Sequence, residues 1–182
     1  MSLDASNIHV AATGAIWYAP AGATMPTDST SALTGFTNLG FLSDGFEVAN
    51  DLKTKEVTVW QTAEVVKLIN QSMSRKINFE AVETNTNTLA LAWGGATVTP
   101  GAGDAYSITI PDAQKTVEFS LILDLTDGDT NARFVFSRVA LSSLPKVKYG
   151  RQDEIKYGFE IQALKPIDNS DIVKIYGVNK AI

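Results

Sequence analysis

The stretch Val117-Glu-Phe-Ser-Leu-Ile-Leu-Asp-Leu125 carries the clearest structural pattern in this chain. Apolar side chains occupy every second position of it, and Glu118, Ser120 and Asp124 stand at positions between them. Alternation with a period of two is typical of a β-strand that buries one face and exposes the other. The exception is Ile122, an apolar residue on the polar face. The stretch therefore predicts a half-buried strand.

The same pattern recurs on both sides of this stretch. Residues 75–82 and 155–163 alternate between apolar and polar side chains, and residues 133–141 are apolar on both sides. Residues 172–178 are β-branched and aromatic, which favours a last strand. Helical periodicity is nearly absent. The sequence therefore predicts a mainly β, antiparallel fold in which each sheet has one buried and one polar face.

One segment departs from the alternation. Thr84-Asn-Thr-Asn-Thr88 supplies side chains that can cap the start of a helix, and apolar residues then recur at i, i+3 and i+4 from Leu89. Gly94-Gly95 stands where a helix commonly ends in the left-handed conformation. These signals predict a short helix over about 86–93. The alternative is a strand with Leu89 and Leu91 on one side.

Turn residues mark three connections. Residues 19–35 are rich in Ala, Gly, Ser, Thr and Pro without periodicity, residues 97–104 form a second such stretch, and residues 127–131 suit a hairpin turn. None is long or charged enough to separate two domains. A chain of 182 residues is large enough for one core, so we expect a single domain over residues 1–182.

Composition excludes several classes of protein. The chain has 15 Lys and Arg against 20 Asp and Glu, a formal charge of −5, which argues against a basic nucleic-acid clamp. It has no cysteine, so no disulfide framework and no thiolate zinc site is expected. No signal-peptide pattern opens the sequence, and no stretch approaches the roughly 18–20 apolar residues that span a bilayer.

The sequence offers little for catalysis. His9 is the one histidine, and neither a Gly-x-Ser-x-Gly motif nor a cysteine accompanies it. Asp124, Asp127 and Asp129 provide carboxylates of the kind that hard cations bind, but their spacing lacks the ligand order of a calcium loop. Asp and Gly are also ordinary residues of a hairpin turn. We therefore expect no enzyme, no cofactor and no metal.

Four segments in the first half of the chain resemble, in the same order, one known family. They are Gly14-Ala-Ile-Trp-Tyr-Ala-Pro-Ala-Gly-Ala-Thr-Met-Pro-Thr-Asp28, Phe36-Thr-Asn-Leu-Gly-Phe-Leu-Ser-Asp-Gly45, Lys53-Thr-Lys-Glu-Val-Thr-Val-Trp-Gln61 and Phe79-Glu-Ala-Val-Glu-Thr-Asn85 with the following Leu89-Ala-Leu-Ala-Trp-Gly94. This order is similar to the major tail proteins, or tail tube proteins, of long non-contractile-tailed bacteriophages. Residues 96–182 resemble the family only as a run of strands.

The resemblance implies a fold and an assembly. The fold is a two-sheet antiparallel β-sandwich or half-barrel with one short flanking α-helix. Six copies would form a ring with a joined inner barrel, and rings would stack into a hollow tube in the virion tail. The implied partners are further copies of the chain, the tape measure protein, the tail terminator and distal tail or baseplate proteins. DNA would pass without specific binding, and the protein would be made in the host cytoplasm.

The resemblance also suggests site residues. The loop at residues 19–35 and an extended hairpin at residues 45–68 would reach neighbouring subunits. The candidates for contacts between subunits are Trp60, Pro20, Pro26 and Asp28. A negatively charged inner wall of the tube would repel DNA phosphate, so carboxylates would suit the lumen. The carboxylates that could face the lumen are Glu56, Glu64, Glu80 and Asp124. The alternatives are an ordinary solvated outer face for the carboxylates and core packing for Trp60.

A second function remains open at this point. Exposed aromatic residues such as Trp17, Tyr18 and Trp60 would also suit a monomeric β-sandwich that binds carbohydrate or another surface. A tube subunit forms rings or polymers, whereas such a module stays monomeric.

Overall fold

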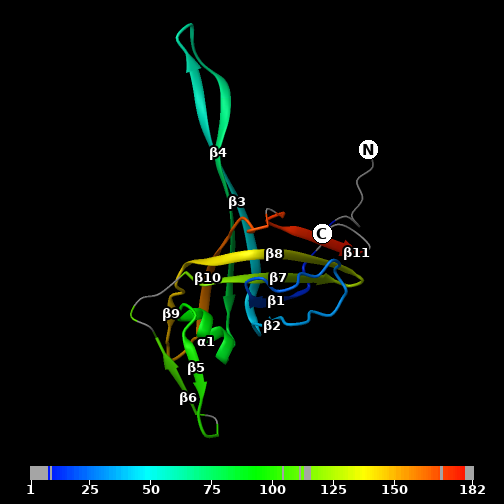
Figure 1. Ribbon diagram of the computed structural model, residues 1–182, viewed down its shortest axis with the longest axis vertical. Coiled ribbons are helices and arrows are strands. Elements are labelled where there is room, and N and C mark those ends of the chain that lie inside the picture. Colours follow the sequence, from blue (N-terminus) through cyan, green and yellow to red (C-terminus); the bar gives the residue numbers. More distant parts are fainter. Residues whose placement is uncertain are drawn as a thin grey trace.

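A computed structural model describes residues 8, 10–103, 105–110, 112, 116–168 and 170–178. His9 lies outside the described residues. The elements (Figure 1) are β1 (Thr13–Pro20), β2 (Thr37–Asn38), β3 (Leu42–Val59), β4 (Thr62–Ala81), α1 (Thr86–Ala92), β5 (Thr97–Pro100), β6 (Tyr106–Thr109), β7 (Glu118–Asp127), β8 (Thr130–Ser143), β9 (Val147–Lys148), β10 (Lys156–Ala163) and β11 (Lys174–Val178).

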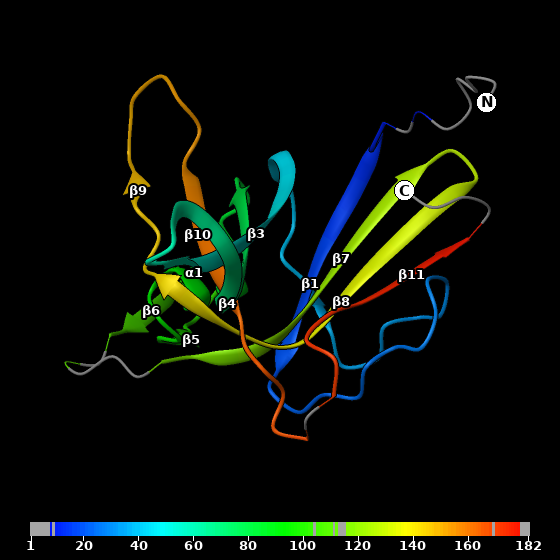
Figure 2. The same ribbon diagram turned by 90° about the horizontal axis from the view of Figure 1, so that it is seen from above.

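Nine of these strands form one antiparallel sheet in the order β2-β1-β7-β8-β10-β4-β3, with β11 added to β8 and β9 added to β10. Strands β5 and β6 pair with each other. Figure 2 shows β7 and β8 bending as they pass between two halves of the sheet, one beside β1 and β11 and one beside β10, β4 and β3. The predicted mainly β, antiparallel fold with one short helix is confirmed.

The register of the strands changes where the sheet bends. Between Phe119 and Leu121 the pairing of β7 with β8 shifts, and between Glu160 and Ile161 the pairing of β10 with β8 shifts. Such bulges bend a strand and increase its local twist. The bend lets both halves direct apolar side chains into one core.

The core follows from the alternation in the sequence. Strands β4 and β10 pair Phe79 with Phe159 and Ile77 with Ile161, and the two Phe rings lie 5.1 Å apart between centroids. Core residues with almost no exposed surface come from both halves of the sheet: Ile16, Leu39, Ile77, Leu121, Leu123, Phe136, Val139, Tyr157, Phe159 and Ile161.

The helix α1 begins after Asn85, whose side-chain oxygen accepts hydrogen bonds from the backbone N–H groups of Asn87 (3.0 Å) and Thr88 (2.9 Å). Its Leu89 and Leu91 are buried in the core. The amide of Asn85 also donates to the backbone oxygen of Leu39 at 3.2 Å, which ties the helix to the segment after β2. Throughout the described ranges, no helix has the length and hydropathy needed to cross a membrane.

Two details of the sequence prediction are wrong. Residues 97–100 form β5, paired with β6, where a loop was expected over 97–104 (Asp104 lies outside the described residues). The face of β7 that carries Ser120 and Ile122 was expected to be polar and solvated, yet both residues are fully buried. Part of the loop at residues 19–35 covers this face, because Met25, Pro26 and Thr27 line a small crevice against Val135 of β8.

Replacing Asn85 tests the anchoring of α1. Asn85→Ala removes the cap of two backbone N–H groups and the bond to Leu39, so we expect a loss of about 1–2 kcal/mol of unfolding free energy. Urea denaturation followed by circular dichroism measures this loss. The control is Thr86→Ala, because Thr86 is exposed and its truncation should change stability by no more than about 0.5 kcal/mol. Equal midpoints for Asn85→Ala and the parent chain would contradict the assignment of the cap.

Candidate functional site

The outer part of the β3–β4 hairpin, residues 52–73, projects beyond the rest of the sheet (Figure 1), and we call it the hairpin arm. Strand β10 pairs with β4 only from Ala81 to Lys76, so within the described residues the arm consists of two strands without a third. Its exposed large apolar residues are Leu52, Val59, Trp60, Val65, Val66, Leu68, Ile69 and Met73. A two-stranded hairpin is only marginally stable in water, and this many exposed large apolar residues on one segment is typical of a contact surface.

The sequence-predicted residues of the arm all lie exposed. Trp60 stands at the turn between β3 and β4, and 99% of its surface is accessible. The alternative prediction, that Trp60 packs in the core, is therefore wrong for the isolated chain. Glu56 lies opposite Leu68 in the pairing of β3 with β4, and Glu64 follows the turn on β4. The arm thus combines a fully exposed tryptophan with carboxylates on both strands.

Arg133 fixes the loop that covers the β7–β8 face. Its guanidinium is buried, with 6% of the residue exposed, and donates to both carboxylate oxygens of Asp124 at 2.7 and 3.0 Å. The same side chain donates to the backbone oxygens of Ser31 (2.9 Å) and Asp28 (3.4 Å). The charge of Asp124 is therefore offset within the subunit, in an ion pair that holds the loop.

The other loop candidates also make local contacts. The Asp28 carboxylate accepts from the backbone N–H groups of Ser31 (2.6 Å) and Thr30 (2.8 Å), and these bonds hold the pKa of Asp28 below its ordinary value. Pro26 lines the crevice against β8, while Pro20 is exposed at the end of β1. Roles of Pro20, Pro26 and Asp28 between subunits stay predictions.

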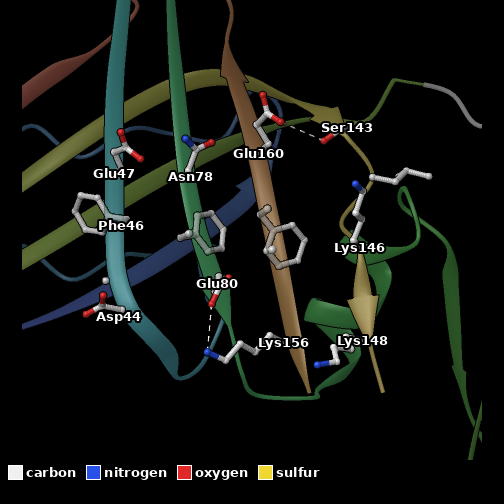
Figure 3. A pocket seen from close by; sticks show the side chains of 15 residues that line it. Asp44, Phe46, Glu47, Asn78, Glu80, Ser143, Lys146, Lys148, Lys156 and Glu160 are labelled. Atoms are coloured by element: carbon white, nitrogen blue, oxygen red, sulfur yellow. Dashed lines mark hydrogen bonds and ion pairs between the residues drawn. The ribbon is translucent and has the colours of Figure 1, made fainter. Parts of the chain in front are cut away.

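A broad groove of about 1090 Å³ lies on the face of β3, β4 and β10 that points away from the core (Figure 3). Asn78 and Glu80 of β4 and Gly158 and Glu160 of β10 form its floor. On one side stand Asp44 and Glu47 of β3, which we call the acidic lip. On the other side stand Lys146 and Lys148, which we call the basic lip.

The charges of the floor are paired within the subunit. Lys76 binds Glu160 at 2.8 Å, which lowers the pKa of Glu160 and raises the pKa of Lys76. Lys156 binds Glu154 at 3.2 Å and Glu80 at 3.5 Å, and these carboxylates, Glu154 foremost, raise the pKa of Lys156. The candidate lumen residue Glu80 therefore sits beside a cation of its own subunit.

The aspartates at the β7–β8 turn do not gather into a metal site. Asp124 is held by Arg133, and Asp127 accepts a hydrogen bond from the backbone N–H of Val10 at 3.2 Å. Over the residues that the structure describes, no group of three or more His, Cys, Asp or Glu side chains is arranged to hold a metal ion.

Sequence reasoning missed the two lips of the groove and the role of Arg133. A signal for Arg133 existed, since a cation within a largely apolar strand commonly has an anionic partner when it is buried; β8 holds a second cation, Arg138, which remains partly exposed. No comparable local signal marks the lips, because Asp44 and Lys146 are distant in sequence and only the pairing of β3, β4 and β10 brings them to one groove.

A bent antiparallel sheet with a protruding arm rich in exposed apolar residues suits a structural protein that assembles through its surface. The comparison with known families agrees with this class: the chain matches the family described as phage tail tube protein over residues 1–179 and belongs to that family. The chain is therefore a structural protein of the phage tail, and it assembles with itself and with other tail components. A search of curated proteins found no match.

Replacing Arg133 tests its hold on the loop. Arg133→Met leaves Asp124 in a partly buried site without its partner, so we expect a loss of about 3–5 kcal/mol of unfolding free energy. If folding is retained, hydrogen exchange of the backbone N–H groups of Thr30 and Ser31 should quicken. The control Arg138→Met breaks the more exposed Arg138–Glu118 pair (2.7 Å) and should cost about 1 kcal/mol. Equal losses for the two variants would contradict the special role of Arg133.

Proposed function

We propose that this chain is the tail tube subunit of a long non-contractile phage tail, and that six copies form a ring. Rings stack into a hollow tube around the tape measure protein, between the tail terminator and the distal tail or baseplate proteins. The observation that carries the proposal is the hairpin arm with its eight exposed large apolar residues. Such a surface needs a partner, and a second copy in a repeating assembly supplies one for every arm.

Symmetry favours this arrangement. A contact that joins two different surfaces of identical subunits repeats from copy to copy. It forms a closed ring when the rotation from one subunit to the next adds up to a full turn, and an open filament when it does not. The edge strand β3 pairs only with β4 along its described length, which leaves its outer backbone groups free. A closed ring removes such edges, which otherwise promote uncontrolled association.

We further propose that the groove face of β3, β4 and β10 lines the lumen. Lys76 and Lys156 are bound by carboxylates, among them Glu160 and Glu80 of the floor, so these two lysines do not offer a free cation to DNA phosphate, and the remaining cations of this face are those of the basic lip. Six copies at −5 each would carry a charge of about −30, which disfavours retention of DNA. We propose Glu80 on this face and Glu56 and Glu64 on the arm as lumen carboxylates, and we leave out Asp124 because Arg133 offsets its charge.

Substitution of Trp60 tests the arm as an assembly surface. Trp60→Ser removes an exposed anchor without touching the core, so the subunit should fold normally by circular dichroism. The critical concentration for rings or tubes, measured by size-exclusion chromatography and negative-stain electron microscopy, should rise about 10- to 100-fold, as expected for an interface hot spot.

The matched control is Ile167→Ser, which removes another large apolar residue, 85% exposed, from a site outside the arm. Its assembly should equal that of the parent chain. A parent protein that stays a monodisperse monomer at all concentrations and when seeded with tail tips, and that binds glycans, would overturn the proposal in favour of a surface-binding module.

Charge reversal on the arm tests the lumen carboxylates. Glu56→Lys with Glu64→Lys should leave tail assembly intact but slow DNA ejection, because cations in the wall retain phosphate. Ejection kinetics and infectivity of particles carrying the double variant measure the effect, which we expect to exceed tenfold. Asp171→Lys is an exposed control outside the arm and the groove. Loss of tube assembly in the double variant would instead place these carboxylates in contacts between subunits.

A further inference from the structure

The groove carries acidic side chains on one side and basic side chains on the other. Asp44 and Glu47 of the acidic lip stand on β3, and Lys146 and Lys148 of the basic lip stand at the opposite side, with β4 and β10 between them (Figure 3). The floor between the lips is balanced by its own ion pairs. Opposite charges therefore lie on opposite sides of one surface, with two strands between them and no ion pair that joins the described side chains of the two lips.

The lip charges are largely free of partners. Within the described part of the chain, Asp44, Glu47 and Lys146 take part in no ion pair. Lys148 lies 3.3 Å from Asp153, but the side chains are 81% and 63% exposed, and an exposed pair of this kind contributes little and exchanges readily. Both lips can therefore bind a new partner at little cost.

Each lip lies at a free strand edge. Among the described strands, β3 pairs only with β4, and β9, which holds Lys148, pairs only with β10. In β3, residues 43–45 face the single residue Glu80 of β4, a bulge in which Gly45 adopts a φ of +82°. The left-handed conformation favours glycine at this position. The bulge carries Asp44 at the rim of the groove.

We propose that the acidic lip of one copy contacts the basic lip of the next copy around the ring. A second copy of this chain fits because it presents both charges at the matching edges, so a head-to-tail contact satisfies the acidic lip of one subunit and the basic lip of its neighbour. Charge complementarity of this kind selects the register and orientation of a contact and penalises a wrong one. This inference rests on the proposed function, because it assigns the contact that closes the ring.

Charge exchange tests the lips directly. One variant carries Asp44→Lys and Glu47→Lys, so both of its lips are positive. A second variant carries Lys146→Glu and Lys148→Glu, so both of its lips are negative. Each variant alone should fold but need at least a tenfold higher concentration to form rings at low salt. An equimolar mixture should form rings near the concentration of the parent chain, because a ring of six accommodates alternating copies.

Two controls sharpen the test. Lys165→Glu with Lys174→Glu makes the same change of charge at exposed positions outside the groove and should assemble like the parent chain. Raising the salt concentration should reduce the difference between each lip variant and the parent chain, since exposed charges are screened within about 10 Å at 0.1 M salt.

The outcomes separate the inference from the proposed function. Rings from the parent chain, impaired single-lip variants and rescue by mixing support the contact. Lip variants that assemble like the parent chain, or impairment without rescue by mixing, overturn it while the tube function stands. A parent chain that forms no rings under any condition, including seeding with tail tips, overturns the proposed function and this inference with it.

Discussion

The structure depends on the continuity of β8 across both halves of the sheet. One edge of β8 pairs with β7, and the other edge pairs first with β11, over residues 131–135, and then with β10, over residues 139–143. A shift of one residue in any of these ladders would turn apolar side chains out of the core. The register of one half therefore fixes the register of the other, and the bulges near Leu121 and Ile161 absorb the bend between them.

This arrangement leaves the molecule incomplete on its own. Among the described strands, the hairpin arm has no third strand and β3 pairs only with β4, and the lips of the groove carry opposite charges on opposite sides. Each of these features is unfavourable or neutral in an isolated subunit. In the ring that we propose, identical copies repeated around an axis would supply a partner for each of these features, and the chain belongs to the phage tail tube protein family.

The Arg133–Asp124 pair shows how far local sequence patterns can be followed. Alternation correctly places Leu121 and Leu123 in the core, but it also suggests that Ser120, Ile122 and Asp124 face solvent. Ile122 was the one apolar residue on that face, and it marks the surface that the loop covers. Removal of one partner leaves the other charge uncompensated in a largely enclosed site, whereas the net contribution of such a pair to stability is small.

Most of the long strands, the short helix and the resemblance to the family could be predicted from the sequence alone, because period-two alternation, an Asn cap and an ordered series of short motifs are local properties of a chain. Three features emerged from the tertiary fold: the pairing of the charges, the packing of residues 25–31 against β8, and the groove that Asp44 and Glu47 share with Lys146 and Lys148. The physical reason is that an ion pair or a groove depends on the register between strands that are distant in sequence. That register is set by the whole core and not by the residues that form the site.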